Sequence, residues 1–304
     1  MSSRPRASAP TTTTPGSSDY AVFRRALRHA APAIRRDLPW INDPRPWAVL
    51  VSEVMLQQTQ TSRVVEPWQR FLKLFPTPTH CADAPLSAVL TAWSGLGYPR
   101  RAKALHGAAR VIRDDFGGEV PSDVALLLQL PGVGEYTAHA VASFAFGRSV
   151  AVLDTNVGRV LARALENRTL RRGEAQTLAA SLLPARNSAG FNQAMLDLGA
   201  QFCRAAPRCE SCPLKTHCAW RRHGGEDPAP QSAAVSRAQT AFVGSNRQLR
   251  GRVLRALTES PRTVRQLARI VSDVESSRRR EVLESLVRDG LVSREGDHYS
   301  LAAG

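Results

Sequence analysis

A short glycine-bearing turn is the part of this sequence whose residue types and spacing most clearly point to a nucleic-acid backbone. The turn LPGVG contains Leu130, Gly132, Val133 and Gly134 and joins two stretches of helical pattern. We expect the two glycines to permit a tight turn in which a Cβ would be penalised. Successive amides there, with those that open the next helix, can then point at one phosphate oxygen. Such a turn grips DNA without reading its sequence.

A lone aspartate follows the turn, and a carboxylate at its position can begin a helix or serve a reaction. Asp154 comes directly after an apolar run at residues 150–153 and before Thr155 and Asn156. A carboxylate at that point can begin a helix as its N-cap or stabilise a developing positive charge. With the turn alone, a protein that only binds DNA is an equally good interpretation, and Asp154 favours an enzyme.

A second carboxyl group, Glu53, lies in the segment SEVMLQQTQ. At helical spacing, Val51, Val54 and Met55 surround it with apolar side chains. Burial disfavours the charged form of a carboxyl group, so Glu53 would suit the role of proton donor. The alternative is that Glu53 is a helix-capping or surface glutamate, because Ser52 precedes it directly.

Four of the five cysteines fall within 16 residues, which predicts a metal or cluster site. Cys203, Cys209, Cys212 and Cys218 have the spacing C-x5-C-x2-C-x5-C. Four thiolates in a short loop suit an iron–sulfur cluster or zinc, and spacing alone does not choose between them. Such clustering fits poorly with a secreted disulfide framework.

The charge balance indicates a polyanionic partner. Among 304 residues there are 41 Lys and Arg against 26 Asp and Glu, for a formal charge of +15. DNA is the simplest such partner. We find no apolar run of 18 residues and no signal-peptide pattern, so we expect a cytoplasmic, nucleoid-associated protein that does not bind membranes.

Hydrophobic periodicity predicts a mainly α fold that positions these residues. Strand-like alternation is scarce before residue 290. The expected helices cover residues 20–33, 47–58, 62–75, 85–93, 100–116, 122–129, 135–146, 156–166, 173–183 and 190–201.

Composition divides the chain into five parts. We expect a disordered tail at 1–18, a helical domain at 19–202, the cysteine loop at 203–220, a linker at 221–245 and a C-terminal module at 246–304. The last part reads as three helices and a hairpin, a winged-helix pattern. Its third helix begins Ser-Ser-Arg-Arg-Arg at 276–280, which suits a DNA groove, although those arginines could equally be a solvated face of a module that docks on protein.

The turn and its aspartate resemble those of the helix-hairpin-helix DNA glycosylases. SEVMLQQTQ followed by VxxxWxxFLxxFPT is similar to the MutY family of A/G-specific adenine glycosylases, and the resemblance covers about residues 20–220. It implies a two-lobed fold. It also implies that Glu53 protonates the adenine ring, that Asp154 stabilises the oxocarbenium-like sugar, and that Asn156 orients Asp154 and the attacking water. An adenine anion is a poor leaving group, so the base must be protonated before it departs, and Glu53 would supply that proton.

The same resemblance assigns residues to DNA. Gln58 and Tyr98 would enter the helix and hold the base out of the stack, with Gln57 and Thr59 beside them in LQQT. Tyr136 stands where related endonucleases place a nucleophilic lysine, and neither Tyr136 nor Glu135 carries an amine. We therefore expect a monofunctional glycosylase that leaves an abasic site. Its expected partner is double-stranded DNA with A:8-oxoguanine or A:G mispairs. We expect the protein to act as a monomer.

The cysteines resemble the loop that holds a [4Fe–4S] cluster in this family, so the resemblance implies that cofactor. The family usually has C-x6-C at the first interval, one residue more than here. Two other departures stand out. Members of this family often have an arginine after the Pro-Trp that precedes the glutamate motif, where this chain has Ile41, and Arg45 could supply the missing polar contact. Many members also end in a nudix-like domain that recognises 8-oxoguanine, and the C-terminal part of this chain lacks that pattern. The loop Phe242–Ser245 could reach the opposite base instead.

Two other functions remain open from the sequence. Some cluster-bearing relatives with Tyr and Asp at these places are thymine glycosylases for T:G mismatches. A non-catalytic regulator could use the winged-helix module to bind DNA and the cluster as a redox sensor. The presence of both Glu53 and Asp154 favours catalysis, and Glu53 in LQQT favours adenine.

Overall fold

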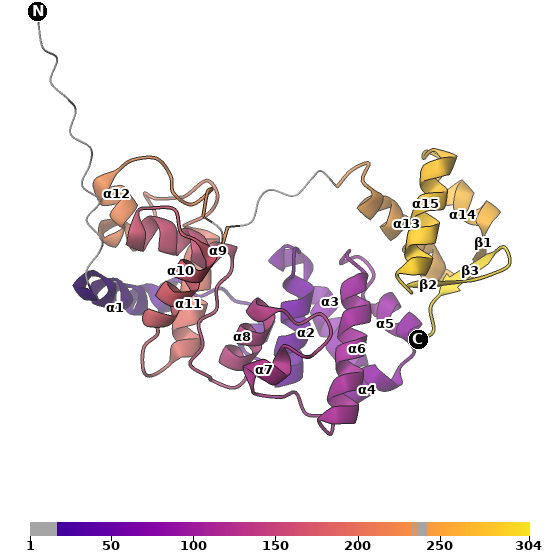
Figure 1. Cartoon of the computed structure of the whole chain (residues 1–304), viewed down its shortest axis with the longest axis horizontal. Helices are drawn as coiled ribbons and strands as arrows, with labels where there is room; N and C mark the ends of the chain where they lie inside the picture. Colours follow the sequence, from indigo (N-terminus) through magenta and orange to yellow (C-terminus); the bar gives the residue numbers. More distant parts are fainter. Residues whose placement is uncertain (1–16, 233, 236–241) are drawn as a thin grey trace, which may run out of the picture. The chain divides into compact units, whose positions relative to one another are not determined.

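The computed structural model describes residues 17–232, 234–235 and 242–304. These residues are mainly helical (Figure 1), which confirms the expected fold class. They form two compact units. Of the described residues, unit 1 combines 17–36 with 151–232 and 234–235, and unit 2 combines 37–150 with 242–304. The expected domain boundaries follow chain order whereas the units interleave, and those boundaries stay a prediction.

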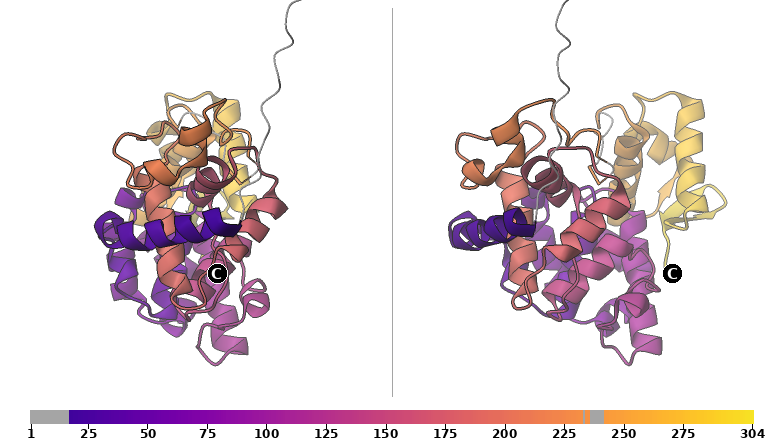
Figure 2. Two further views of the ribbon diagram at one scale, coloured as in Figure 1. Left: turned by 90° about the vertical axis from the view of Figure 1, so that its left-hand side faces the viewer. Right: turned by 60° about the vertical axis from the view of Figure 1, so that its left-hand side comes forward.

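Unit 1 is built around the packing of α1 against α11, which Figure 2 shows as the indigo helix beside a salmon one. Phe23, Leu27 and Ile34 recur at helical spacing on α1 and are buried. The elements of unit 1 are α1 (Ser17–Ile34), α9 (Thr155–Val160), the π-helical η3 (Leu161–Glu166), α10 (Arg172–Ser181), α11 (Ser188–Gln201), η4 (Lys215–His217) and α12 (Ala219–His223).

Two details of unit 1 differ from the expectation. Helix α1 begins at Ser17, so residues 17–18, which were expected to belong to a disordered tail, are helical. Residues 1–16 of that expected tail lie outside the described residues. The helix that starts after Asp154 changes to a π turn at Leu161, and Asn167 ends it in the left-handed conformation with φ 48°. Such π turns are rare and cannot be read from hydrophobic periodicity.

The helical lobe of unit 2 packs around one hydrophobic cluster that includes Trp40, Trp68, Phe71 and Trp93. The expected helix 62–75 is in fact a 3-10 turn followed by α3. The elements of the lobe are η1 (Pro39–Ile41), α2 (Pro46–Leu56), η2 (Thr61–Arg63), α3 (Val65–Leu74), α4 (Pro78–Asp83), α5 (Leu86–Ala92), α6 (Arg100–Asp115), α7 (Val124–Leu127) and α8 (Glu135–Phe144).

Helix α4 was absent from the sequence expectation, although its start carries a clear signal. Thr77 accepts a hydrogen bond from the backbone N of His80, and Pro78 occupies the first helical position. A Ser or Thr cap followed by proline is typical of a helix start, and the short apolar pattern of α4 concealed it.

The C-terminal module has the helix and strand order of a winged helix, as expected. It comprises α13 (Asn246–Glu259), β1 (Arg262–Thr263), α14 (Val264–Ile270), α15 (Ser276–Arg288), β2 (Val292–Glu295) and β3 (His298–Leu301). The antiparallel sheet has the order β1-β3-β2, with Val292 opposite Leu301 and Arg262 opposite Tyr299. The two-residue β1 is too short for its pattern to show in the sequence.

This module is packed against the helical lobe of unit 2. The hydrophobic cluster of the lobe continues into Leu249, Val253 and Leu257 of α13. The backbone N of Leu86 in α5 donates to the carbonyl oxygen of Ala303 at 2.9 Å, and Figure 1 shows the C-terminus beside α5. Among the described residues, no helix has both the length and the apolar character needed to cross a bilayer.

Candidate active site and nucleic-acid interface

Glu53 lies in the middle of α2, which is buried on nearly every side. Its side chain is 5% exposed. Helix α2 begins at Pro46, so Glu53 is in its third turn, and the Ser52 hydroxyl donates to the carbonyl oxygen of Val49 at 2.8 Å. The structure therefore excludes the capping and surface interpretations of Glu53. A carboxyl group buried within an apolar helix is unusual and is often functional.

The loop that follows α2 contains Gln57, Gln58 and Thr59. Gln58 has φ 56° and Tyr98, in the loop before α6, has φ 49°, both in the left-handed region. Residues other than glycine adopt this conformation at a cost of about 1–3 kcal/mol each, and such strain is concentrated at functional sites. The two side chains expected to enter DNA are thus the two strained positions in this part of unit 2.

Arg101 of α6 ties these two loops together, and the sequence analysis did not find it. Its Nη1 donates to the carbonyl oxygens of Val54, Met55 and Gln57 at 2.6–2.9 Å. Its Nη2 donates to Thr59 Oγ1 at 3.0 Å and to the carbonyl oxygens of Leu96 and Gly97.

The same guanidinium packs against aromatic rings. Its central carbon lies 5.4 Å from the ring centre of Trp93 and 5.3 Å from that of Tyr98. Burial lowers the pKa of Arg101 to about 10, so it stays charged at neutral pH. Arg101 therefore holds the loops of Gln58 and Tyr98 in fixed positions with its hydrogen bonds and its ring contacts.

The glycine turn leads from α7 to α8 and is anchored by Leu130 and Val133, which are both buried. Gly132 has φ 77°, and a Cβ there would lie 2.6 Å from the Cβ of Ala104. Gly134 differs from the expectation: it is the N-cap of α8 with φ −95°, and a Cβ would meet open space. Of these two positions, only Gly132 has a backbone conformation and a close neighbour that require glycine. Gly134 has no side chain that could cover the first amides of α8, so these amides stay accessible to an anion.

The turn is joined to the loop after α2. Gln57 Nε2 donates to Thr137 Oγ1 at 3.2 Å and to the carbonyl oxygen of Gly132 at 3.4 Å. Tyr136 is the second residue of α8 and is half-buried. These contacts and those of Arg101 join Gln57, Thr59 and Tyr98 to the turn at Gly132. Glu53, Gln58 and Tyr136 belong to the same unit.

Asp154 lies in unit 1, as the N-cap of α9. Its Oδ1 accepts a hydrogen bond from the backbone N of Val157 at 2.8 Å, and its Oδ2 accepts one from Asn156 Nδ2 at 2.6 Å. Burial raises the pKa of Asp154, and these two hydrogen bonds together with the charge of Arg159 oppose that rise. The expected pairing of Asn156 with Asp154 is present.

A chain of hydrogen bonds runs from Asp154 to the cysteine loop. Arg159 Nη2 donates to Asn156 Oδ1 at 2.6 Å, and its Nε donates to the carbonyl oxygen of Cys203 at 2.6 Å. Gly199 of α11 allows this close packing, because a Cβ there would lie 2.6 Å from the carbonyl oxygen of Asn156. The buried Arg159 therefore connects Asp154, through Asn156, to the first cysteine.

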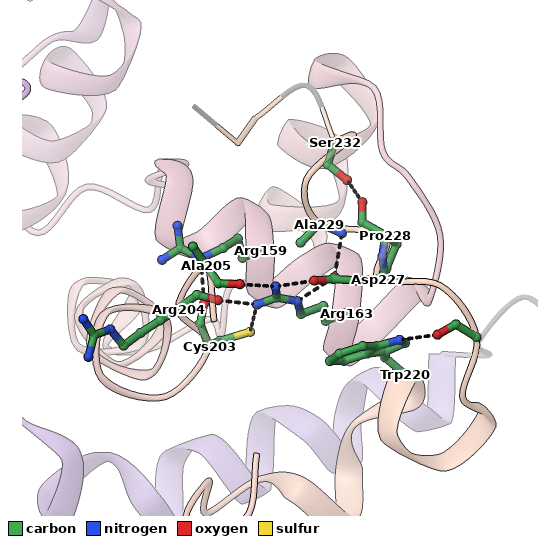
Figure 3. A network of polar contacts seen from close by, with 11 residues as sticks. Arg159, Arg163, Cys203, Arg204, Ala205, Trp220, Asp227, Pro228, Ala229 and Ser232 are labelled. Carbon is green, nitrogen blue, oxygen red and sulfur yellow. Dashed lines mark hydrogen bonds and ion pairs between the residues drawn. The ribbon is translucent and has the colours of Figure 1, made fainter. Parts of the chain in front are cut away.

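Arg163, one turn further on, holds the start of the cysteine loop (Figure 3). It is 1% exposed, and it donates to Cys203 Sγ at 3.6 Å and to the carbonyl oxygens of Arg204 and Ala205 at 2.6 and 3.1 Å. Asp227 accepts from Arg163 Nη2 at 2.6 Å on the other side. Burial acts to lower the pKa of Arg163, but Asp227 and Cys203 raise it above its usual value.

Residues 219–232 are ordered on unit 1, although 221–245 reads as a linker. Ala219–His223 forms α12, and the Trp220 ring lies 5.5 Å from the Arg163 guanidinium. Ser232 is buried and its hydroxyl donates to the carbonyl oxygen of Pro228 (Figure 3). The Gly, Pro and Ser composition of this segment suggests flexibility, whereas its contacts with Arg163 and the unit 1 core order it.

All four expected cysteine ligands line one mostly apolar cavity with Leu198, Phe202 and Trp220. Burial raises the pKa of the Cys203 thiol to about 11, and it also raises those of Cys212 and Cys218. No three His, Cys, Asp or Glu side chains of the described residues meet as a ligand set for a single metal ion. Four thiol groups that line one cavity are a donor set that can hold a metal or an iron–sulfur cluster.

Arg45, which could replace the arginine that Ile41 lacks, forms an ion pair with Asp43. Arg45 donates to Asp43 through Nη2 and Nε at 2.6 and 2.8 Å, and its hydrogen bond lowers the pKa of Asp43. Ile41 packs against the hydrophobic cluster of unit 2. The structure therefore gives no support to Arg45 as a base contact.

The comparisons with known proteins agree with this geometry. The sequence model of the HhH-GPD superfamily of base excision DNA repair proteins matches residues 51–184. The adenine DNA glycosylase of Mycobacterium tuberculosis (strain CDC 1551 / Oshkosh) is 46% identical over 274 residues, which cover 86% of this chain and 87% of that protein. The enzyme of the same name from Mycolicibacterium smegmatis is 44% identical over 280 residues, with 89% and 92% covered.

The fold is also similar to a solved one. A thermostable thymine-DNA glycosylase matches with a TM-score of 0.63 at 29% identity, over 67% of this chain and 97% of that one. The family resemblance inferred from SEVMLQQTQ and the glycine turn is thus confirmed. The chain belongs to the adenine DNA glycosylases of the MutY type, enzymes of base-excision DNA repair in the helix-hairpin-helix superfamily.

Proposed function

We propose that this chain hydrolyses the N-glycosidic bond of adenine mispaired with 8-oxoguanine or guanine, and that it leaves an abasic site. One observation carries this proposal: Glu53 is buried in the apolar interior of α2, one turn before the strained loop of Gln58. A buried carboxyl group favours its protonated form, and departure of adenine requires a proton. A surface that only bound DNA would not need such a group.

The chemistry divides between two carboxyl groups. Glu53 gives its proton to a ring nitrogen of adenine as the bond between sugar C1′ and the base breaks, and the bonding electron pair leaves with the base. Asp154, as a carboxylate, stabilises the positive charge that develops on the sugar until water adds to C1′. Asn156 positions Asp154 through the 2.6 Å hydrogen bond.

The remaining residues hold the substrate. The amides at the start of α8 and the turn at Gly132 contact a phosphate, while Gln58 and Tyr98 fill the space that the flipped nucleotide leaves. Gln57, Thr59, Leu130 and Val133 support these two elements. Tyr136 carries no amine for Schiff-base formation, so the enzyme does not cut the strand by that route.

Cys203, Cys209, Cys212 and Cys218 would hold a [4Fe–4S] cluster, the group that best fits four sulfurs around one apolar cavity. When bound, it would supply a rigid cross-link for the loop and no bond cleavage. Arg163 and Arg159 fix the same loop from the protein side. Colourless protein with one zinc per chain would contradict this assignment.

We place the enzyme in the cytoplasm, acting as a monomer on nucleoid DNA. Elution at about 33 kDa from a sizing column would support the monomeric state, and a stable dimer would contradict it.

Single-turnover base release tests the function. Four otherwise matched duplexes would carry A:8-oxoguanine, A:G, A:T and T:G. We expect adenine release from the first two, fastest opposite 8-oxoguanine, and no strand cleavage before alkali treatment. Release only from T:G would overturn the proposal in favour of a thymine glycosylase. Binding without release from any duplex would favour a regulator.

A further inference from the structure

An aspartate at the end of α15 joins the C-terminal module to the helical lobe of unit 2. Asp289 is the C-cap residue of α15, and its side chain is 8% exposed. Arg100, the first residue of α6, donates to Asp289 Oδ2 through Nε at 2.7 Å and contacts the other carboxylate oxygen through Nη2. Arg250 of α13 contacts the same carboxylate from within the module. Asp289 thus connects three helices.

A carboxylate is an unfavourable group at this end of a helix. The last backbone carbonyl groups of a helix carry a partial negative charge, which repels an anion beside them. The cations around Asp289 offset this cost. The hydrogen bond from Arg100, with a smaller contribution from that of Arg250, lowers the pKa of Asp289. The acidic residue is therefore explained by its contacts between helices and not by the stability of α15 alone.

A lysine makes a second contact between α6 and the end of α15. Lys103 Nζ donates to the backbone carbonyl oxygen of Asp289 at 2.7 Å. Gly290 permits this approach, because its φ is 62° and a Cβ there would lie 2.3 Å from Lys103 Nζ. The first turn of α6 is therefore held by both the side chain and the backbone of Asp289.

This turn of α6 follows Tyr98 directly. The backbone N of Arg101 donates to the carbonyl oxygen of Tyr98 at 2.9 Å, and that of Lys103 donates to the carbonyl oxygen of Pro99 at 3.2 Å. Tyr98 has a left-handed φ of 49°. Such a conformation persists in a residue other than glycine only where the surrounding structure enforces it, and the fixed first turn of α6 is part of that structure.

The module also contacts the ring of Tyr98. Arg247, in the first turn of α13, has its guanidinium carbon 5.3 Å from the centre of that ring. Arg250, three residues later, donates to Ser285 Oγ at 2.6 Å and contacts Asp289, so α13 is fixed against α15. Asp289 therefore supports two contacts of the module with Tyr98, one to the ring through α13 and one to the backbone through α6.

The arginines at the start of α15 are used inside the module. Arg278 Nε donates to Asn246 Oδ1 at 2.7 Å, and Arg279 Nη1 donates to the carbonyl oxygen of Ala268 at 3.0 Å. The next turn of the helix exposes Glu281, which would repel a DNA phosphate. These contacts favour a module that supports the lobe over one that reads a DNA groove.

We propose that Asp289 is a positioning residue for Tyr98, and that the winged-helix module holds the Tyr98 loop in place and does not read a groove. The inference rests on the proposed function, because it takes Tyr98 as a side chain that fills the space left by the flipped nucleotide. Asp289 itself touches no substrate. It fixes the first turns of α6 and α13, so the Tyr98 ring meets the duplex in one orientation. This preorganisation reduces the entropy that is lost when the base pair opens.

A double-mutant cycle tests whether Asp289 acts through Tyr98. The duplex would carry 2-aminopurine in place of the adenine opposite 8-oxoguanine, because the fluorescence of this base rises when it leaves the stack. Stopped-flow fluorescence at saturating enzyme, recorded before any base is released, would give the equilibrium constant for base opening. The proteins are the wild type, Asp289→Asn, Tyr98→Ala and the double variant. Asp273→Asn is the matched control, since it breaks another ion pair of α13, with Arg252.

We expect Asp289→Asn to lower the opening constant by about 5-fold to 20-fold, and to have no further effect once Tyr98 is replaced by alanine. Asp273→Asn should match the wild type. If the effects of Asp289→Asn and Tyr98→Ala simply add, or if Asp289→Asn opens the base as the wild type does, the proposal is overturned. Melting curves would accompany each variant. If Asp289→Asn unfolds, Arg100→Gln decides alone, because this exposed arginine carries the same link.

Base release from the A:8-oxoguanine duplex separates this proposal from the proposed function. An enzyme that shows the coupling between Asp289 and Tyr98 but releases no adenine would keep the role of Asp289 and overturn adenine excision. An enzyme that releases adenine, and whose Tyr98→Ala variant opens the base as well as the wild type, would keep excision and overturn the role of Asp289.

Discussion

The two units each place one carboxyl group in buried surroundings, but they differ in the hydrogen-bond donors that the group meets. Glu53 in unit 2 lies in the middle of a buried helix, among apolar side chains. Asp154 in unit 1 stands at a helix N-terminus and accepts hydrogen bonds from Val157 and Asn156. The apolar surroundings of Glu53 suit a proton donor. Burial also raises the pKa of Asp154, but its hydrogen bonds and the charge of Arg159 oppose that rise and support the carboxylate. Two side chains of nearly the same chemistry are thereby suited to different steps of one reaction.

The largest effect is expected from Glu53→Gln. The amide keeps the shape and cannot deliver a proton, so single-turnover adenine release should fall by roughly 1,000-fold or more while DNA affinity is kept. Glu66→Gln, at a glutamate that is 88% exposed on α3, is the control and should be neutral. A Glu53→Gln enzyme within 10-fold of wild type would remove the acid role from Glu53.

Asp154→Asn should slow base release by roughly 100-fold to 1,000-fold, because the negative charge near the sugar is lost. The fold should not suffer: asparagine is an equally good N-cap and removes a charge whose burial is unfavourable. The variant should therefore melt at or above the wild-type temperature. Asp123→Asn changes another N-cap aspartate, at α7, and should leave the rate unchanged.

The bridge between Asp154 and the cysteine loop predicts an intermediate effect. Arg159→Gln removes the donors to Asn156 and to the Cys203 carbonyl, so base release should slow by about 10-fold to 100-fold. Because the same change loosens the cysteine loop, the 400 nm absorbance and iron content per chain should fall with it. Arg186→Gln, an exposed position in unit 1, should change neither. If base release slows while the iron content per chain is unchanged, Arg159 acts only by positioning Asn156.

Unit 2 offers the matching test at Arg101. Arg101→Lys keeps the charge but cannot serve the carbonyl oxygens of both loops, so the free energy of unfolding should fall by roughly 2–3 kcal/mol. Base release should slow several-fold through misplaced Gln58 and Tyr98. Thermal unfolding of Arg101→Lys against Arg110→Lys, an exposed arginine on the same helix, checks the first point. Equal melting temperatures would contradict it.

The smallest expected effect is on pH dependence. Burial raises the pKa of Asp154, so its carboxylate is lost at a higher pH than for an exposed aspartate, and the rate should fall as the pH drops through that range. Stability should move the other way, because protonation relieves the buried charge. The advantage of Asp154→Asn in melting temperature should therefore shrink as the pH falls. A constant difference would show that Asp154 keeps an ordinary pKa.

The sequence anticipated the helical class, the turn at Gly132 and the four cysteines, because these depend on local pattern and spacing. It reached Glu53 only through family resemblance, since a glutamate after a serine reads equally well as a cap. It misjudged Gly134, whose φ is ordinary. It did not foresee that Asp227 and Ser232, inside the segment expected to be a linker, hydrogen-bond to Arg163 and Leu170. It missed α4 despite the Thr-Pro signal at its start.

What the sequence determined by itself is which chemical groups are present and where helices can form, since helical periodicity, caps and cysteine spacing are local properties. Only the tertiary structure decided which of the 41 basic residues do more than attract DNA. Arg101, Arg159, Arg163 and Arg247 are indistinguishable from the others in one dimension. Their partners are backbone carbonyls, a carboxylate and aromatic rings far away along the chain, and those partners come together only when the units fold.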